Sequence, residues 1–205
     1  MINAGRIVDV DAMIRIRKGD GYTSFFRPFE DGAAGIMVPH VKSGSEAEWV
    51  VCNARYPPIG RRGTETAMSD ADNSFADPLA YLQHANRETF VVVQIEDAEA
   101  LDHLDEIVSL EGIDVVFVGP ADLSVSLGVP FQFQSQTYLD ALGKIRSAAH
   151  RHDKYWGLPV GDCAAAARYA EQGARFFCIG SDLRFFKAAC VALRAEFDQV
   201  VTSTL

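Results

Sequence analysis

The feature that most constrains this chain is a set of short, almost continuously apolar runs that alternate with helical patterns. Strands with one solvent-exposed face alternate apolar and polar residues, whereas strands covered on both faces are apolar throughout. The runs therefore predict the strands of a parallel sheet. They are residues 12–16 (AMIRI), 35–40 (GIMVPH), 90–96 (FVVVQIE), 115–119 (VVFVG), 155–160 (YWGLPV) and 175–180 (RFFCIG).

The segments between and after these runs show helical periodicity. In segment 97–111, apolar residues recur at spacings of three and four, which predicts one helix with Asp97 as N-cap and Gly112 as its stop. In segment 184–198, a similar stripe predicts an amphipathic closing helix. That stripe consists of Phe186, Ala189, Cys190, Leu193 and Phe197.

Strands that alternate with helices indicate βαβ units, which form either a barrel or a doubly wound sheet. No GxGxxG pattern follows the first run, so we predict a (β/α)₈ barrel of the TIM type. Such barrels typically need ~250 residues. The 205 residues form one predicted domain, 1–205, with about six βα units visible and about one and a half to two units absent at the N-terminal side.

Composition narrows the classes of partner. The 19 basic residues against 28 acidic ones give a net charge of −9, which disfavours nucleic acid. No apolar stretch approaches the ~20 residues that cross a bilayer, and the start of the chain lacks the apolar region of a signal peptide. The four cysteines show no CxxC spacing, so we expect reduced thiols and a cytoplasmic protein.

Two carboxylates follow consecutive predicted strands. Glu96 ends VVVQIE and Asp122 lies in GPADLS, 26 positions later, so both are expected at the same rim of the sheet. Adjacent carboxylates repel unless a cation or proton lies between them, which favours a hard divalent metal such as Mg²⁺ or Mn²⁺. The alternative is that Glu96 caps the following helix and that Asp122 is an N-cap.

The GPAD turn is a candidate anion site. Gly119 and Pro120 end the strand, and the backbone N–H groups of Ala121 and Asp122 would then open a helix, where a substrate carboxylate can bind. A plain strand-to-helix turn is the alternative.

Two further side chains are candidates for catalysis at strand ends. Arg15 or Arg17 could stabilise an enolate oxyanion, or both could be surface arginines. His40 could serve as a base, or it could be a half-buried structural histidine. The proline- and glycine-rich loop 55–63 could shape the active-site rim or form a rigid connection.

Taken in order, six segments resemble the HpcH/HpaI aldolase/citrate lyase family of metal-dependent 4-hydroxy-2-oxo-acid aldolases. The resemblance runs from about residue 12 to 198, and the combination of QIE with GPADLS is its most specific part. The segments are GAAGIMVPHV, the RYPPIGRRG loop, VVVQIE, GIDVVFVGPADLSVSLG, WGLPVG and GARFFCIGSD.

The resemblance implies a (β/α)₈ barrel, N-terminally incomplete in this chain, in which Glu96 and Asp122 hold the divalent metal, Mg²⁺, Mn²⁺ or Co²⁺. Pyruvate would chelate that metal, with its carboxylate on the N–H groups of Ala121 and Asp122 and with Gln94 beside the metal waters. Arg15 matches the arginine that stabilises the enolate, with Arg17 as the alternative. The family also implies a homo-oligomer in which the last helix, here within 184–205, is exchanged between subunits.

One part of the family pattern has no counterpart in this chain. The first two strands and the Asp-x-Glu-His segment that carries the catalytic histidine are absent, so we expect either a fragment of a longer product or a remodelled N-terminus. His40 is the candidate replacement for that base. The expected activity is cleavage of a 4-hydroxy-2-oxo acid to pyruvate and an aldehyde.

Two other functions stay open at this point. The first is a catalytically impaired homologue that binds metal and oxo acids or associates with a full-length paralogue. The second is an acyl-CoA lyase, although no obvious basic surface for a CoA phosphate is present.

Overall fold

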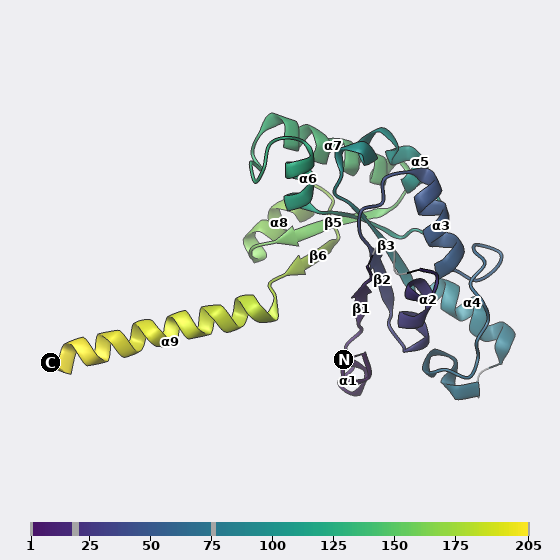
Figure 1. Ribbon diagram of the computed structural model, residues 1–205, viewed down its shortest axis with the longest axis horizontal. Helices are drawn as coiled ribbons and strands as arrows, with labels where there is room; N and C mark the ends of the chain where they lie inside the picture. Colours follow the sequence, from purple (N-terminus) through teal and green to yellow (C-terminus); the bar gives the residue numbers. More distant parts are fainter. Residues whose placement is uncertain (1, 18–20, 75–76, 205) are drawn as a thin grey trace.

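The structure is a computed structural model that describes residues 2–17, 21–74 and 77–204 (Figure 1). Six strands form one sheet in which every pair is parallel and the spatial order equals the order in the chain. The strands are β1 (Met13–Arg15), β2 (Gly35–Val38), β3 (Phe90–Ile95), β4 (Val115–Val118), β5 (Tyr155–Val160) and β6 (Phe176–Ile179).

All six predicted runs form strands, and their sequential order decides the architecture. A doubly wound sheet changes direction at a switch point, whereas the wall of a TIM-type barrel does not. The sheet curls into part of such a barrel (Figure 1), so the prediction of about six βα units is confirmed.

Four helices lie along the outside of the curled sheet and pack against one another in succession (Figure 1): α2 (Thr23–Glu30), α3 (Gly44–Ala54), α5 (Leu104–Val108) and α7 (Gln136–Arg151). Within the described residues, no helix is both long and apolar enough to cross a membrane. The helices are α1 (Ile2–Ile7), α2 (Thr23–Glu30), α3 (Gly44–Ala54), α4 (Pro78–Glu88), α5 (Leu104–Val108), α6 (Pro120–Ser126), α7 (Gln136–Arg151), α8 (Cys163–Glu171) and α9 (Asp182–Thr204), with 3₁₀ turns η1 (Ser69–Ser74) and η2 (Ala98–Asp102).

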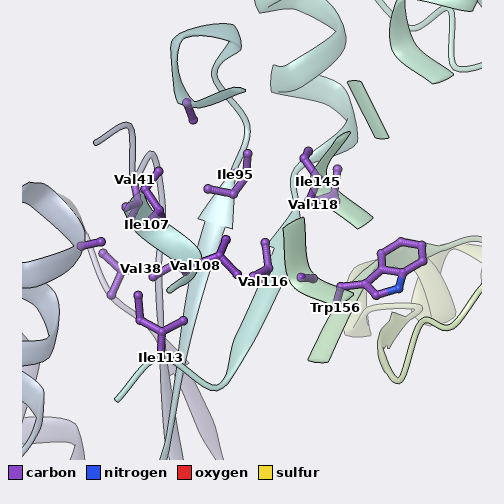
Figure 2. Close-up of a cluster of buried hydrophobic side chains, with 14 of the residues drawn as sticks. Val38, Val41, Ile95, Ile107, Val108, Ile113, Val116, Val118, Ile145 and Trp156 are labelled. Atoms are coloured by element: carbon purple, nitrogen blue, oxygen red, sulfur yellow. The ribbon is translucent and has the colours of Figure 1, made fainter. Parts of the chain in front are cut away.

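Both faces of the central strands are buried, which explains why the runs are apolar throughout. On the outer face, Val38, Ile95 and Val116 pack with residues of α5 and α7 such as Ile107 and Ile145 (Figure 2). On the inner face, alternate strand residues form a second cluster, as the two-residue period of a strand requires. That cluster contains Met37, Val92, Val115 and Phe117, with Met13, Phe90 and Phe176 packed against it.

The prediction of one helix over 97–111 is wrong, because the segment folds as η2 followed by α5 with His103 between them. The apolar stripe is nevertheless buried, since Leu104 and Ile107 contribute to the core. Asp97 occupies the N-cap position of η2, but its side chain makes no capping hydrogen bond. Gly112 follows with a positive φ of 96°, as a stop residue should.

The predicted C-terminal helix is confirmed as α9, which is 23 residues long. It extends away from the sheet (Figure 1), and its apolar side chains are exposed, with Phe186 and Leu193 at 70% and 67%. The helix therefore does not close the barrel of its own chain.

The loop at 55–63 is anchored by Arg55 at the amino ends of the strands. Arg55 is buried and donates hydrogen bonds to the carbonyl oxygens of Gly112, Asn86 and Thr89, and it pairs with Asp114. Thr89 and Asp114 immediately precede β3 and β4, so Arg55 lies at the sheet end opposite the carboxyl rim. The contacts of Arg55 thus favour the rigid connection over the alternative in which loop 55–63 shapes the active-site rim.

Candidate active site

Polar side chains from three neighbouring strands contact one another at the carboxyl end of the sheet. Arg15 ends β1, His40 follows β2 by two residues, and Gln94 and Glu96 lie at the end of β3. The Nε of Arg15 donates a hydrogen bond to the Oε1 of Gln94 over 3.0 Å. The structure thus brings four predicted site residues into one cluster.

Glu96 is the centre of this cluster, and its side chain is fully buried. Its Oε2 accepts a 2.5 Å hydrogen bond from the Nε2 of Gln94. Its Oε1 accepts a 3.0 Å hydrogen bond from the backbone N–H of His40 and lies 3.7 Å from the Nη2 of Arg15. Because both oxygens are used in this way, the alternative that Glu96 caps the next helix is wrong.

Burial raises the pKa of the Glu96 carboxyl, and the charge of Asp122 raises it further, while His40 and Arg15 act in the opposite direction. Two carboxylates in one partly buried site fit a cation, because a positive charge removes their repulsion. Among the described residues, no group of three His, Cys, Asp or Glu side chains is arranged as metal ligands. A bound cation would therefore complete its shell with water or substrate oxygens, which Mg²⁺ and Mn²⁺ commonly do.

Gly119 allows Glu96 to lie against the end of β4. A Cβ at this position would be 2.3 Å from the Oε2 of Glu96 and 2.8 Å from the Nε2 of Gln94, distances that are too short for any side chain. The backbone φ of Gly119 is −95°, so the requirement for glycine is one of space and not of backbone conformation.

The GPAD turn opens α6 as the sequence predicts. Gly119 is the N-cap and Pro120 the first helical residue, so the alternative of Asp122 as N-cap is wrong. The hydrogen bond that closes the first turn runs from the Leu123 N–H to the Gly119 carbonyl. The N–H groups of Ala121 and Asp122 precede this bond, which leaves them directed out of the helix start.

His40 lies in the site because β2 ends at a proline. Pro39 has no N–H for the ladder, and His40 then adopts a left-handed conformation with φ of 55°. Its ring Nδ1 lies 3.0 Å from the Oδ2 of Asp97 and 3.4 Å from the Oε1 of Glu96. The side chain is 40% exposed, which fits a group that can reach a ligand.

Sequence analysis missed Asp97 and Lys42 as members of this rim. The sequence patterns indicate Asp97 only as a helix cap, although its position directly after Glu96 at the same strand end is a signal that could have identified it. The Nζ of Lys42 lies 3.4 Å from the Oδ1 of Asp97. Of the two arginines, the structure favours Arg15, because its guanidinium contacts Gln94 and Glu96, whereas Arg17 lies beyond the end of β1.

Comparisons with known proteins agree with this architecture. The HpcH/HpaI aldolase/citrate lyase family model matches residues 2–189. The chain is 35% identical over 171 residues to a 5-keto-4-deoxy-D-glucarate aldolase of Shigella boydii serotype 18, covering 83% of this chain and 66% of that protein. It is 37% identical over 189 residues to a hydroxypyruvate/pyruvate aldolase of Pseudomonas aeruginosa, covering 89% of this chain and 68% of that protein.

The fold has a close counterpart among solved structures. The crystal structure of an HpcH/HpaI aldolase from Desulfitobacterium hafniense DCB-2 superposes with a TM-score of 0.84 at 27% identity, covering 98% of this chain and 75% of that one.

The chain spans just under two thirds of the length of the 5-keto-4-deoxy-D-glucarate aldolase that it matches. Because the family model covers nearly the whole chain, this protein belongs to the HpcH/HpaI aldolase/citrate lyase family.

Proposed function

We propose that this protein is a divalent-metal-dependent, class II aldolase that cleaves 4-hydroxy-2-oxo acids to pyruvate and an aldehyde. The observation that carries the proposal is the buried Glu96 carboxylate, held by Gln94 and the His40 backbone and within 3.7 Å of the Arg15 guanidinium. Relatives named as aldolases of oxo acids support the same chemistry.

Glu96 and Asp122 are the proposed ligands of the metal, Mg²⁺ or Mn²⁺, with Co²⁺ as a further candidate. A divalent ion supplies Lewis acidity to a substrate carbonyl when it is bound. Gln94 donates to the Oε2 of Glu96 and thereby fixes the direction of the other oxygen, Oε1.

The substrate is held by groups on both sides of Glu96. The N–H groups of Ala121 and Asp122 at the start of α6 bind the carboxylate of the oxo acid, because such N–H groups have no partner within the helix. Arg15 stabilises the oxyanion that develops on the keto oxygen, since its guanidinium carries a permanent positive charge and is held at the rim by the Oε1 of Gln94.

His40 is the proposed base. It removes the proton of the 4-hydroxyl group, the C3–C4 bond breaks, and its electron pair forms the enolate of pyruvate while the aldehyde leaves. Return of the proton to C3 then gives pyruvate, so that His40 ends in its starting state.

A catalytically impaired protein that binds metal and oxo acid is the second candidate. The observation that favours it is the open sheet, in which β1 and β6 are the two edge strands of the described residues. Exposed edges leave the inner face of the barrel wall incompletely covered.

Thermal melts of the purified chain test the proposal, with and without Mg²⁺ or Mn²⁺ and with oxalate as a planar mimic of the pyruvate enolate. We expect an upward shift only when metal and oxalate are both present, since a ligand at 100 times its Kd stabilises the folded state by ~2.7 kcal/mol. Assays of pyruvate release from a 4-hydroxy-2-oxo acid then separate the active enzyme from the impaired one.

Two variants make the test specific. Glu96→Gln should abolish both the melting shift and pyruvate formation, whereas Glu88→Gln on the exposed end of α4 should leave both unchanged. A Glu96→Gln protein that retains the wild-type rate of metal-dependent pyruvate release would overturn the metal assignment.

A further inference from the structure

We propose that Asp97 is a positioning residue that orients the ring of His40, and that Lys42 holds Asp97 in place. The inference rests on the proposed function, because it assigns how His40 presents a nitrogen to the substrate. Neither Asp97 nor Lys42 touches the reacting atoms in this assignment.

The contacts form a continuous chain of three side chains. The Nδ1 of His40 lies 3.0 Å from the Oδ2 of Asp97, and the Oδ1 of Asp97 lies 3.4 Å from the Nζ of Lys42. Lys42 also lies 3.6 Å from the Oε2 of Glu99. The Asp97 side chain is 19% exposed, so its contacts are partly shielded from water.

A carboxylate beside Nδ1 selects one form of the imidazole ring. A neutral histidine carries its proton on one of two nitrogens, and a carboxylate can only accept. The Nδ1 of His40 faces two carboxylates, Asp97 and, at 3.4 Å, Glu96. The proton is therefore held on Nδ1, and the lone pair that accepts a proton from the substrate is on Nε2.

The backbone of His40 is held separately from its ring. Its N–H is bound to Glu96, and the next N–H, that of Val41, donates to the Gln94 carbonyl over 3.3 Å. These two bonds fix the left-handed turn at His40, while Asp97 fixes the rotation of the ring. Loss of Asp97 should thus free the ring without removing the turn.

Lys42 offsets the charge that Asp97 adds to an already acidic rim. Asp97 is a third carboxylate beside Glu96 and Asp122, and an ammonium group at 3.4 Å reduces the resulting repulsion. Lys42 is itself anchored, because its backbone N–H donates to the Oε2 of Glu46 over 2.8 Å in the first turn of α3. The start of α3 therefore sets the position of the lysine.

The first experiment records the ring ¹⁵N resonances of His40 by NMR in the metal-free protein. His40→Gln identifies the resonances among the five histidines. We expect an Nδ1–H ring in the wild type and in Asp102→Asn, a control on η2. In Asp97→Ala we expect a shift toward the Nε2–H form, which free histidine prefers.

The second experiment measures exchange of the methyl protons of pyruvate with D₂O, with Mg²⁺ or Mn²⁺ present. Asp97→Ala should lower kcat by about 10- to 100-fold, below the full ~10²–10⁴-fold effect of a general base, and should leave KM nearly unchanged. Asp97→Asn should recover part of the loss, because its amide oxygen can still accept from Nδ1–H. Lys42→Met should lower kcat in the same direction.

The outcomes separate this inference from the proposed function. If Asp97→Ala keeps both the wild-type ring resonances and the wild-type kcat, the positioning role is wrong. If the wild type itself shows no exchange, the proposed function fails, and the NMR spectra alone then decide whether Asp97 orients His40. Asp97→Asn is isosteric, so it keeps the test decisive even if Asp97→Ala is poorly folded.

Discussion

At the scale of single residues, the proposed site depends on the absence of a side chain at Gly119. The Glu96 carboxylate occupies the space that any Cβ at residue 119 would need. Glycine at the end of β4 is therefore as necessary for the buried carboxylate as the hydrogen bonds that Gln94 and the His40 backbone donate to it. The same glycine is the N-cap of α6. Gly119 therefore both leaves space for the Glu96 carboxylate and begins the helix whose N–H groups are proposed to bind the substrate.

We predict that Gly119→Ala abolishes the melting shift produced by metal with oxalate, because the new methyl group displaces Glu96. The loss of stability should be moderate, about 1–3 kcal/mol, as is typical of overpacking. Gly143→Ala in α7 is the matched control, since a Cβ there meets nothing within 4 Å. The control should raise the free energy of unfolding by ~0.5–1 kcal/mol and keep the ligand response. A normal shift in Gly119→Ala would show that Glu96 does not bind the ligand.

At the scale of elements, an ionic contact joins α5 to the end of α7. The Oδ1 of Asp105 lies 2.6 Å from the Nη2 of Arg151 and 2.8 Å from the Nε2 of His152. Hydrogen bonds from Arg151 and then from His152 lower the pKa of Asp105 below its ordinary value of 3.8. The sequence places these residues in separate segments, and only the packing of α5 on α7 brings them together.

The lowered pKa of Asp105 predicts how the free energy of unfolding changes with pH. A folded-state pKa below the unfolded one means that Asp105 contributes stability above the unfolded value and loses it as the pH falls through the folded pKa. We expect Asp105→Asn to be less stable than the wild type near neutral pH, with the difference vanishing in strong acid. Urea unfolding of both proteins from pH 2 to 7 measures this difference. A difference that stays constant over this range would show that the contact is not ionic.

At the scale of the whole molecule, α9 extends away from the sheet and does not pack on the core of its own chain. Exposed apolar side chains run along it, with Phe197 at 60% and Val200 at 58% beside Phe186 and Leu193. Burying such side chains is favourable by roughly 1.5–3 kcal/mol each. We propose that α9 packs on a second copy of this chain, as the predicted exchange between subunits requires.

We predict that the double substitution Leu193→Glu with Phe197→Glu converts an oligomer into monomers, because charges on the apolar face oppose its burial. Light scattering coupled to size-exclusion chromatography measures the mass. A matched double variant, Lys187→Gln with Arg194→Gln, lowers the net charge by the same two units, lies off the predicted stripe and should keep the oligomer. A wild type that is monomeric at high concentration would contradict the proposal.

Two different sequence patterns predicted the strands of this protein and its candidate site residues. The continuous apolar runs predicted all six strands, because burial of both faces leaves no polar positions in a strand. The carboxyl ends of those strands identified Arg15, His40, Gln94 and Glu96, since parallel strands carry their functional groups at one edge. The proposed substrate class came only from the family resemblance, through motifs such as QIE and GPADLS.

Tertiary structure alone decided which of those residues touch and which helices pack. Segment 97–111 shows one helical stripe, yet it divides at His103, because periodicity reports burial and not hydrogen-bond continuity. Asp97 satisfies the sequence rule for a cap, but the turn at Pro39 and His40 places an imidazole against it. Contacts between residues far apart in the chain depend on how strands end and turn, and local sequence does not encode that geometry.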